Sequence, residues 1–337
     1  MTEIVRPARL EDLDQLCALL EHVDPGMITM PQTPEDMESR VVRSMAAFKR
    51  ESAAPVHEAY FLVLETDGKI VGTSSIFTNL GSFRPFYNYR ISRQSKTSPD
   101  TGVSVETQIM HLVNDYHGAT ELGTLYLLPA FRGGGRGRLL SFARLMLIAA
   151  DPLRFGPKVI AEIRGWTNDD GVSPFWENVG RKFFQMDYAK ADKLSIKDHR
   201  FISDLMPRYP IYVDLLADEA QSVIAKPHDN AGAAMAVLES QGFYYDNMID
   251  IFDAGPCVEA HTESIDIVRS ATRQTAHEWR YADELSRGLI ASCDYTNFAV
   301  AAFQAHDDRA DVLANLKVSK TDEVLAYAFN TPVKRKA

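Results

Sequence analysis

The first fifty residues contain a short strand-like run of apolar residues and longer stretches with apolar residues at helical spacing. Residues 4–7 form a strand-like run, and residues 10–23 carry apolar side chains at helical intervals, which predicts a helix directly after the first strand. A second helix is expected from Pro34, because Thr33 is a suitable N-cap and proline suits the first helical position. The chain is therefore expected to open with a strand followed by two helices.

Two β-rich runs follow at residues 59–65 and 69–77. The dipeptide Asp67-Gly68 lies between them, and Asp-Gly is favoured in the tight turns that join antiparallel strands. The two runs are therefore expected to form a β-hairpin, which extends the predicted order of elements to β, α, α, β, β.

A further α/β unit is predicted in the middle of the chain. Residues 121–129 have the continuous apolar character of a buried strand, a glycine-rich stretch follows, and residues 139–151 form a mostly apolar helix. Residues 158–165 are another strand, and residues 173–184 predict a short helix with a stop at Gly180. This alternation indicates a fold of the α/β (α+β) class.

The later chain contains one internal similarity. Residues 176–180 (WENVG) and residues 238–242 (LESQG) both precede aromatic side chains, which suggests a second unit of the same type. Apolar runs near the C-terminus are short, as expected of β structure. The predicted organisation is a ligand-binding domain at residues 1–200, its continuation with a partial repeat at residues 201–255, and a mainly β region at residues 256–337.

Charge balance and cysteine content restrict the class of protein. The 337 residues include 46 acidic and 36 basic ones, a formal net charge of -10 that disfavours a general binder of nucleic acids or anionic membranes. The three cysteines are widely separated and lack metal-ligand spacing, which suits a reducing compartment. No apolar run approaches the ~18 residues that cross a bilayer, and no export signal opens the chain. We expect a cytoplasmic protein with no membrane segment and no bound metal.

The segment FRGGGRGRLL, residues 131–140, carries the clearest sign of a ligand. It has no Gly-Lys-Ser/Thr sequence, and it lacks the third glycine of a dinucleotide-binding fingerprint. Glycines allow successive backbone N–H groups to point into one concavity, and the start of a helix favours anions. The pattern Arg132-x-x-Gly135-x-Gly137 between a strand and a helix therefore predicts a pyrophosphate-binding loop, with an ordinary glycine-rich turn as the alternative.

This motif and its surroundings resemble the coenzyme A motif Arg/Gln-x-x-Gly-x-Gly/Ala of the GNAT superfamily of acyl-CoA-dependent N-acyltransferases. The resemblance implies a GNAT-type fold, in which residues 1–200 bind acyl-CoA. The residues that it implies in binding the coenzyme A phosphates are Arg132, Gly133, Gly134, Gly135, Arg136 and Gly137.

Several longer segments look like the arginine N-succinyltransferases. They include FYNYRIS (86–92), TELGTLYLLPAFR (120–132), KVIAEIRG (158–165), SPFWENVGRKFFQMDYAKAD (173–192), FISDLMPRYPIY (201–212) and GFYYDNMIDIFDAGP (242–256). Their length and unusual composition argue against coincidence. The resemblance implies an enzyme of arginine catabolism that transfers the succinyl group of succinyl-CoA to the α-amino group of L-arginine.

The same resemblance implies roles for two residues. Leu125, in the strand before the glycine loop, matches the position assigned to succinyl-CoA binding, although a buried strand alone also explains a leucine. His228 matches the histidine assigned as proton donor, and an imidazole with an ordinary pKa of ~6.5 suits the protonation of the coenzyme A thiolate near neutral pH. Spacing alone favours no catalytic duty for His228.

An arginine acceptor carries a guanidinium group and an α-carboxylate, so its pocket should offer carboxylates at one end and cationic or amide donors at the other. Glu162 and Arg164 have these chemistries and share one face of a predicted strand, where an ion pair between them is the alternative. Asp250 and Asp253 are further candidates for the guanidinium group, and Asp253 also suits a turn.

Several positions depart from the usual sequence of the family. They are residues 26–31, His117, Gly123, the triple glycine, and Asp229 to Ala231 after His228. These changes leave open ornithine as the acceptor, or another acyl group. A catalytically silent subunit that binds coenzyme A or a partner chain is a further alternative, which the intact glycine motif and the retained histidine oppose. The family implies an oligomer, formed with a second copy or with a paralogous chain.

Overall fold

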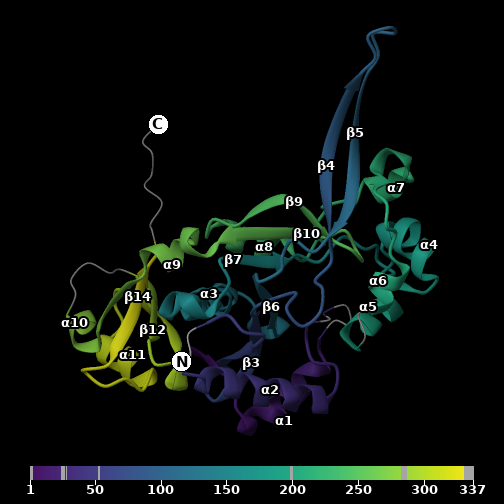
Figure 1. Ribbon diagram of the computed structural model, residues 1–337. Helices are drawn as coiled ribbons and strands as arrows, with labels where there is room; N and C mark the ends of the chain where they lie inside the picture. The colour runs from purple at the N-terminus through teal and green to yellow at the C-terminus, as the bar shows by residue number, and fades with distance from the viewer. Residues whose placement is uncertain are drawn as a thin grey trace.

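The computed structural model describes residues 3–23, 27, 29–51, 54–197, 200–281 and 287–329. Within these residues the strands form one 14-stranded sheet of order β11-β14-β12-β13-β1-β2-β3-β6-β7-β10-β9-β4-β5-β8 (Figure 1). The strands are β1 (Glu3–Pro7), β2 (Ala59–Thr66), β3 (Lys69–Phe77), β4 (Asn88–Thr97), β5 (Ser104–Val113), β6 (Thr120–Leu127), β7 (Lys158–Glu162), β8 (Ile211–Tyr212), β9 (Tyr244–Asp250), β10 (Pro256–His261), β11 (Thr272–Thr275), β12 (Arg287–Ser292), β13 (Val300–Gln304) and β14 (Glu323–Ala328). The helices are α1 (Leu13–Leu20), α2 (Pro34–Lys49), α3 (Arg136–Ala150), α4 (Arg181–Phe184), α5 (Tyr188–Lys197), α6 (Arg200–Leu205), α7 (Asp218–Gln221), α8 (Gly232–Glu239), α9 (Asp266–Ser270), α10 (Ala276–Arg280) and α11 (Arg309–Asn315).

The predicted order of the first five elements is confirmed. Thr33 caps α2, because its side-chain oxygen accepts a hydrogen bond from the main-chain nitrogen of Asp36 at 3.1 Å. Asp67 and Gly68 have φ angles of 49° and 79° and join β2 to β3. Positive φ at both central residues is what a tight hairpin turn requires, so the Asp-Gly signal identified this turn correctly.

Both faces of the central sheet are covered by helices. Along β2, Tyr60, Leu62 and Leu64 belong to the apolar cluster around α3, whereas Phe61 and Val63 belong to the cluster around α1 and α2. Side chains on a strand alternate between faces, so an unbroken apolar run fits a strand buried on both sides. The central sheet is therefore buried on both faces.

The strand–loop–helix–strand order of the middle segment is confirmed as β6, α3 and β7, but the predicted stop at Gly180 is wrong. A π turn at Trp176–Gly180 continues directly into α4, and the helical segment ends before Gln185, which has a φ angle of 51°. A Cβ atom at Gly180 would lie 2.2 Å from the ring of Trp176. Close packing against Trp176, and not the end of a helix, accounts for the glycine at position 180.

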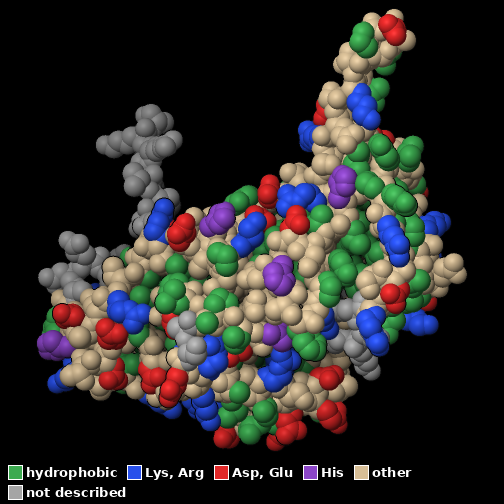
Figure 2. Space-filling view, viewed as in Figure 1, with side chains coloured by type: hydrophobic (Ala, Val, Ile, Leu, Met, Phe, Trp, Pro, Cys, Tyr) green, Lys and Arg blue, Asp and Glu red, His purple; other side chains and the backbone are tan. Residues whose placement is uncertain are grey.

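A long hairpin formed by β4 and β5 was not predicted from the sequence. Figure 1 shows it as an arm that projects from the body of the molecule, and most side chains of its outer half are exposed. Acidic and basic side chains are interspersed over the face in Figure 2, and apolar side chains gather beside the base of the arm. The exposed apolar residues of α6, β8 and the loops beside them are Leu205, Tyr209, Tyr212 and Leu215.

The C-terminal strands extend the sheet from the edge of β1. Val300 of β13 pairs with Val5, and β10 lies inside the sheet between β7 and β9. The expected mainly β region, 256–337, contains β10 to β14 together with α9 to α11, while residues 330–337 lie outside the described residues. In the internal similarity, Gly180 has a helical φ of -56° and Gly242 a φ of +92°, so the two matched segments differ locally. No helix within the described residues is both long and apolar enough to cross a membrane.

Candidate active site

The strands β6 and β7 are parallel neighbours that separate after their first residues. Thr120 pairs with Val159 and Glu121 with Ile160, and the ladder ends there although both strands continue. A cavity of about 240 Å³ lies at this separation and is lined by residues of β6, β7, α3 and α8. Because the strands no longer bond to each other, their main-chain groups are accessible to a ligand that enters the gap.

A β-bulge shapes the β6 side of this cavity. Ser75 of β3 pairs with Gly123 and Thr73 with Tyr126, so Thr124 and Leu125 together stand opposite one residue. Thr124 has a φ of 53°, and its main-chain nitrogen donates to the hydroxyl oxygen of Thr29 at 3.1 Å. The bulge directs Leu125, the residue predicted to bind succinyl-CoA, to the cavity wall.

Two of the family departures lie at or near this bulge. A Cβ atom at Gly123 would lie 2.8 Å from the ring of Phe77, so glycine is required by the close approach of that ring. In the segment 26–31, Met27 and Thr29 line the cavity, while Gly26 and Ile28 lie outside the described residues.

The predicted glycine loop leads into α3. Gly133, Gly134 and Gly135 have φ angles of 98°, 61° and 87°, a run of left-handed conformations that only glycine adopts readily, and Gly135 is the N-cap of the helix. A Cβ atom at Gly133, Gly135 or Gly137 would meet nothing within 4 Å. The loop is therefore an open main-chain surface at the positive end of a 15-residue helix.

The two arginines of the loop have different surroundings. Arg132 is exposed, and its Nε donates to the carbonyl oxygen of Leu127 at 3.4 Å. Arg136 is half-buried, and its Nε lies 2.6 Å from a carboxylate oxygen of Glu3. Arg132 can therefore turn towards an anion at little cost, whereas Arg136 must share its charge with Glu3.

His228 lies beside the cavity at the start of the turn that leads to α8. Its main-chain nitrogen donates to the carbonyl oxygen of Arg164 at 2.8 Å, and its carbonyl oxygen accepts from the nitrogen of Ala231. Arg164 and Ala231 line the cavity. The Nδ1 of His228 accepts a hydrogen bond from the main-chain nitrogen of Asn230 at 3.2 Å, so the neutral ring carries its proton on Nε2.

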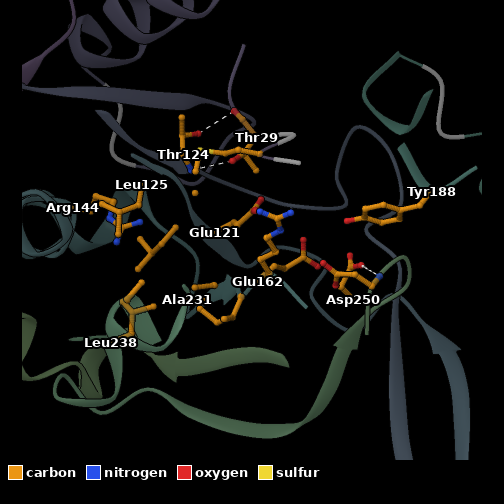
Figure 3. Close-up of a pocket in the computed structure, with 18 residues that line it drawn as sticks. Thr29, Glu121, Thr124, Leu125, Arg144, Glu162, Tyr188, Ala231, Leu238 and Asp250 are labelled. Atoms are coloured by element: carbon orange, nitrogen blue, oxygen red, sulfur yellow. Dashed lines mark hydrogen bonds between the residues drawn. The ribbon is translucent and has the colours of Figure 1, made fainter. Parts of the chain in front are cut away.

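Two glutamates stand in the middle of the cavity. Figure 3 shows Glu121 and Glu162 with Leu125, Arg144 and Leu238 on one side and Tyr188 and Asp250 on the other. Glu121 is only 7% exposed, and its carboxylate accepts no hydrogen bond from any described residue; burial raises its pKa to about 7 against the attraction of Arg40 and Arg84. Burial and the charge of Glu121 raise the pKa of Glu162 to about 8, although Asn88 donates to this carboxylate at 2.9 Å. Both glutamates therefore titrate near neutral pH.

A second cavity, of about 210 Å³, adjoins the first. Thr29, Glu121, Glu162 and Asp250 line both cavities. Arg40 and Arg84 line the second one, and burial lowers the pKa of both guanidinium groups, to about 10 for Arg40. Arg40 donates to the carbonyl oxygen of Thr29 at 3.2 Å and lies over the ring of Phe77. The second cavity is thus lined by both guanidinium and carboxylate groups.

The structure brings the four candidate acceptor residues together around the first cavity. Glu162, Arg164, Asp250 and Asp253 all line it. Asp253 accepts hydrogen bonds from the main-chain nitrogens of Gly165 and Gly255 at 2.8 Å each, so it fixes a turn, as its alternative interpretation held. Burial and the neighbouring carboxylates raise the pKa of Asp250 well above its ordinary value. Within the described residues, no group of three or more histidine, cysteine or acidic side chains could hold a metal ion.

Four charged residues of the two cavities were missed by sequence reasoning: Glu121, Arg40, Arg84 and Arg144. Glu121 could have been noticed as a charge at the start of an otherwise apolar strand. Arg40 and Arg84 lie on α2 and in the loop before β4, far from the other lining residues in sequence, and no spacing pattern links them to the site.

Comparison with known proteins identifies the family of this chain. A family model described as arginine N-succinyltransferase beta subunit matches residues 3–267. An arginine N-succinyltransferase of Yersinia pestis (strain Pestoides F) is 40% identical over 274 residues, which are 80% of this chain and 78% of that protein. An arginine N-succinyltransferase subunit beta of Pseudomonas aeruginosa is 40% identical over 264 residues, 78% of this chain and 77% of that protein.

A solved structure extends the likeness to the whole fold. The arginine/ornithine succinyltransferase subunit AI of Pseudomonas aeruginosa superimposes with a TM-score of 0.86 and 29% identity, and the match covers 98% of this chain and 99% of that one. The chain belongs to the arginine N-succinyltransferase family.

Proposed function

We propose that this chain is an acyl-CoA-dependent acyltransferase that moves the succinyl group of succinyl-CoA to the α-amino group of L-arginine. The observation that carries the proposal is that two cavities share the lining residues Thr29, Glu121, Glu162 and Asp250 where β6 and β7 separate. One is bordered by a bulged strand that leads to a glycine loop, and the other offers arginines and carboxylates. A thioester and an amino acid could meet in such a space at Glu121.

The donor is assigned to the side of α3. The main-chain N–H groups of the loop from Gly133 to Gly137 receive the pyrophosphate, with Arg132 and Arg136 as the supporting cations. The pantetheine arm follows β6 into the gap, and the thioester carbonyl meets main-chain donors near Leu125. Such donors stabilise the oxyanion of the tetrahedral intermediate.

The proton transfers are assigned to two side chains. The α-ammonium group of the acceptor gives a proton to Glu121, whose pKa of about 7 makes it a competent base at neutral pH. The amine then attacks the thioester carbon, the C–N bond forms, and the C–S bond breaks. His228, in its protonated form, gives a proton to the departing thiolate and is left as a neutral imidazole, and the new amide nitrogen releases its second proton to solvent.

The acceptor is assigned to the second cavity. Arg40 and Arg84 pair with its α-carboxylate, and the carboxylates of Glu162 and Asp250 pair with the side-chain cation. Arg164 lines the first cavity and balances the charge of Asp253. L-ornithine has the same α-groups and a shorter cationic side chain, and the solved relative is described as an arginine/ornithine succinyltransferase, so ornithine is the second candidate acceptor.

Thiol release from succinyl-CoA tests the proposal, with L-arginine, L-ornithine, L-lysine or no acceptor in parallel. Release with arginine well above the other samples supports it, and equal release with ornithine assigns the broader specificity. A protein that binds coenzyme A in a calorimeter but releases no thiol with any acceptor is a non-catalytic subunit, which contradicts the proposal.

An oligomer in the cytoplasm is part of the same proposal. The apolar side chains beside the β4–β5 arm, defined by Leu205, Tyr209, Tyr212 and Leu215, support burial against a second copy or a paralogous chain. Light scattering of the purified chain distinguishes these cases, because only self-association gives a mass above that of one chain.

A further inference from the structure

Arg144 is a charged residue inside α3, in which every residue from Leu139 to Ile148 is buried. It lies in the middle of α3, its side chain is 2% exposed, and its neighbours Ala143 and Leu145 are fully buried. A guanidinium group loses favourable hydration when it is buried, and proteins normally compensate with a carboxylate partner.

No carboxylate lies within ion-pair distance of Arg144 among the described residues. Its Nε donates to the carbonyl oxygen of Ser141 at 3.2 Å, and its NH2 group donates to the hydroxyl oxygen of the same serine at 2.8 Å. Both acceptors are neutral and belong to the same helix. Arg154, the other buried arginine of this segment, instead has its Nε 2.9 Å from a carboxylate oxygen of Asp151.

The unpaired charge faces the first cavity. Arg144 lines it together with Leu125 and Leu238, and Figure 3 shows these three at the side away from Tyr188 and Asp250. The acidic side chains thus lie towards the second cavity, and a buried cation lies at the opposite side. An anion that enters along β6 would find Arg144 as its partner.

The position of Arg144 separates it from the phosphates of coenzyme A. It follows Arg136, the first residue of α3, by eight positions, which is roughly 12 Å along the helix axis. The pyrophosphate site is at the start of the helix, so Arg144 is two turns deeper, at the level of Leu125 and the acyl group. The anion that reaches this depth belongs to the acyl group itself.

We propose that Arg144 binds the free carboxylate of the succinyl group and selects succinyl-CoA over acyl-CoA donors without that charge. The inference rests on the proposed function, because it assumes an acyl-CoA in the first cavity with its thioester near Leu125. A charged partner compensates for the burial of Arg144 only when the correct donor is bound. Burial lowers the pKa of Arg144 to about 9, which leaves the group charged at neutral pH.

The test compares three ligands on the wild type and on two variants. Calorimetry gives the Kd of succinyl-CoA, of butyryl-CoA, which has the same chain length without the carboxylate, and of coenzyme A. The wild type should bind succinyl-CoA at least ~10-fold more tightly than butyryl-CoA. Arg144→Met should weaken succinyl-CoA by ~30-fold or more and leave coenzyme A within about twofold, because a lost charge pair in a buried site costs that much. Arg144→Lys keeps the charge but loses the planar guanidinium group, so its Kd for succinyl-CoA should lie between those of the wild type and Arg144→Met.

Arg154→Met is the matched control, since it removes a buried arginine that lies outside the cavity. It should lower the Tm but keep the wild-type ratio of the succinyl-CoA and butyryl-CoA affinities. Equal weakening of all three ligands by Arg144→Met, or a wild type that does not discriminate succinyl-CoA from butyryl-CoA, overturns the inference. The binding ratios need no turnover, so a wild type that prefers succinyl-CoA but releases no thiol with arginine would contradict the proposed function alone.

Discussion

The main-chain nitrogen of His228 donates a hydrogen bond to the carbonyl oxygen of Arg164, and the two atoms are 2.8 Å apart. Next to this bond, Pro227 forms an isolated bridge with Gly165. A residue from the turn before α8 is thereby fixed at the end of β7, beside the cavity. The main chain makes this contact, so replacement of the imidazole should remove only the hydrogen bond from Asn230 and leave the attachment to β7 in place.

His228→Ala should lower kcat by ~100-fold or more and leave the Kd of coenzyme A close to the wild-type value. The imidazole is assigned only to the proton that the thiolate receives, and general acids contribute roughly this factor. Steady-state thiol release and calorimetry measure the two quantities. Asp229→Ala, at the exposed neighbouring position, serves as the control and should keep the wild-type kcat. A kcat within about threefold of wild type in His228→Ala would exclude the residue from the mechanism.

Gly137→Asp should weaken coenzyme A binding strongly, whereas Gly137→Ala should not. A Cβ atom at Gly137 meets nothing within 4 Å, and the residue lies in the first turn of α3 with no positive φ, so alanine fits without strain. The aspartate adds a negative charge where the pyrophosphate is assigned. Calorimetric Kd values for coenzyme A test whether the pyrophosphate binds at this loop. Equal affinities for the two variants would mean that the phosphates bind elsewhere.

Gly135→Ala tests the conformation of the loop separately from its charge. Gly135 has a φ of 87°, and a residue with a Cβ atom is disfavoured there by about 1 to 2 kcal/mol. We expect a lower free energy of unfolding and a weaker affinity for coenzyme A in urea titrations and calorimetry, respectively. Unchanged values for both would show that the left-handed turn is not needed.

The elements with local signals were predictable from the sequence. The N-cap of α2 follows from Thr33 before Pro34, and the turn between β2 and β3 follows from Asp67-Gly68 between two apolar runs. The glycine loop was recognised for the same reason, because three adjacent positive φ angles require three glycines. Gly180 was misread, because a glycine chosen for packing against Trp176 looks the same in sequence as one that ends a helix.

The parts of the site that depend on tertiary structure were not predictable. Glu121 of β6 and Arg40 of α2 line the same cavity, and their separation in sequence gives no sign of this. His228 was identified through family resemblance alone. Arg144 illustrates the limit most clearly, since a charge inside an apolar helix is visible in the sequence but its lack of a partner is visible only in the fold.

Glu121→Gln should reduce the pH dependence of stability. Burial raises the pKa of Glu121 in the folded chain to about 7 from an ordinary value of 4.5, so its contribution to stability is present below about pH 4.5 and is lost as the pH rises through 7. Between pH 5 and 8 this loss is about 2 kcal/mol. Urea unfolding at both pH values should show a smaller difference in the variant by this amount, and an unchanged difference would mean that Glu121 titrates normally.

Arginine binding should release protons near neutral pH, because a cation beside a protonated carboxyl group lowers its pKa. Burial and Glu121 raise the pKa of Glu162 to about 8, so at pH 7 this group is mostly protonated in the free protein. A guanidinium group bound at Glu162 should release about half a proton or more at pH 7, and the release should vanish above about pH 9, where Glu162 is already ionised. Calorimetry in buffers of different ionisation enthalpy measures the number of protons released.

L-citrulline, which has a side chain of the same length without the charge, should release fewer protons, and so should arginine with the Glu162→Gln variant. Equal release for both amino acids on the wild type would place the guanidinium group away from Glu162.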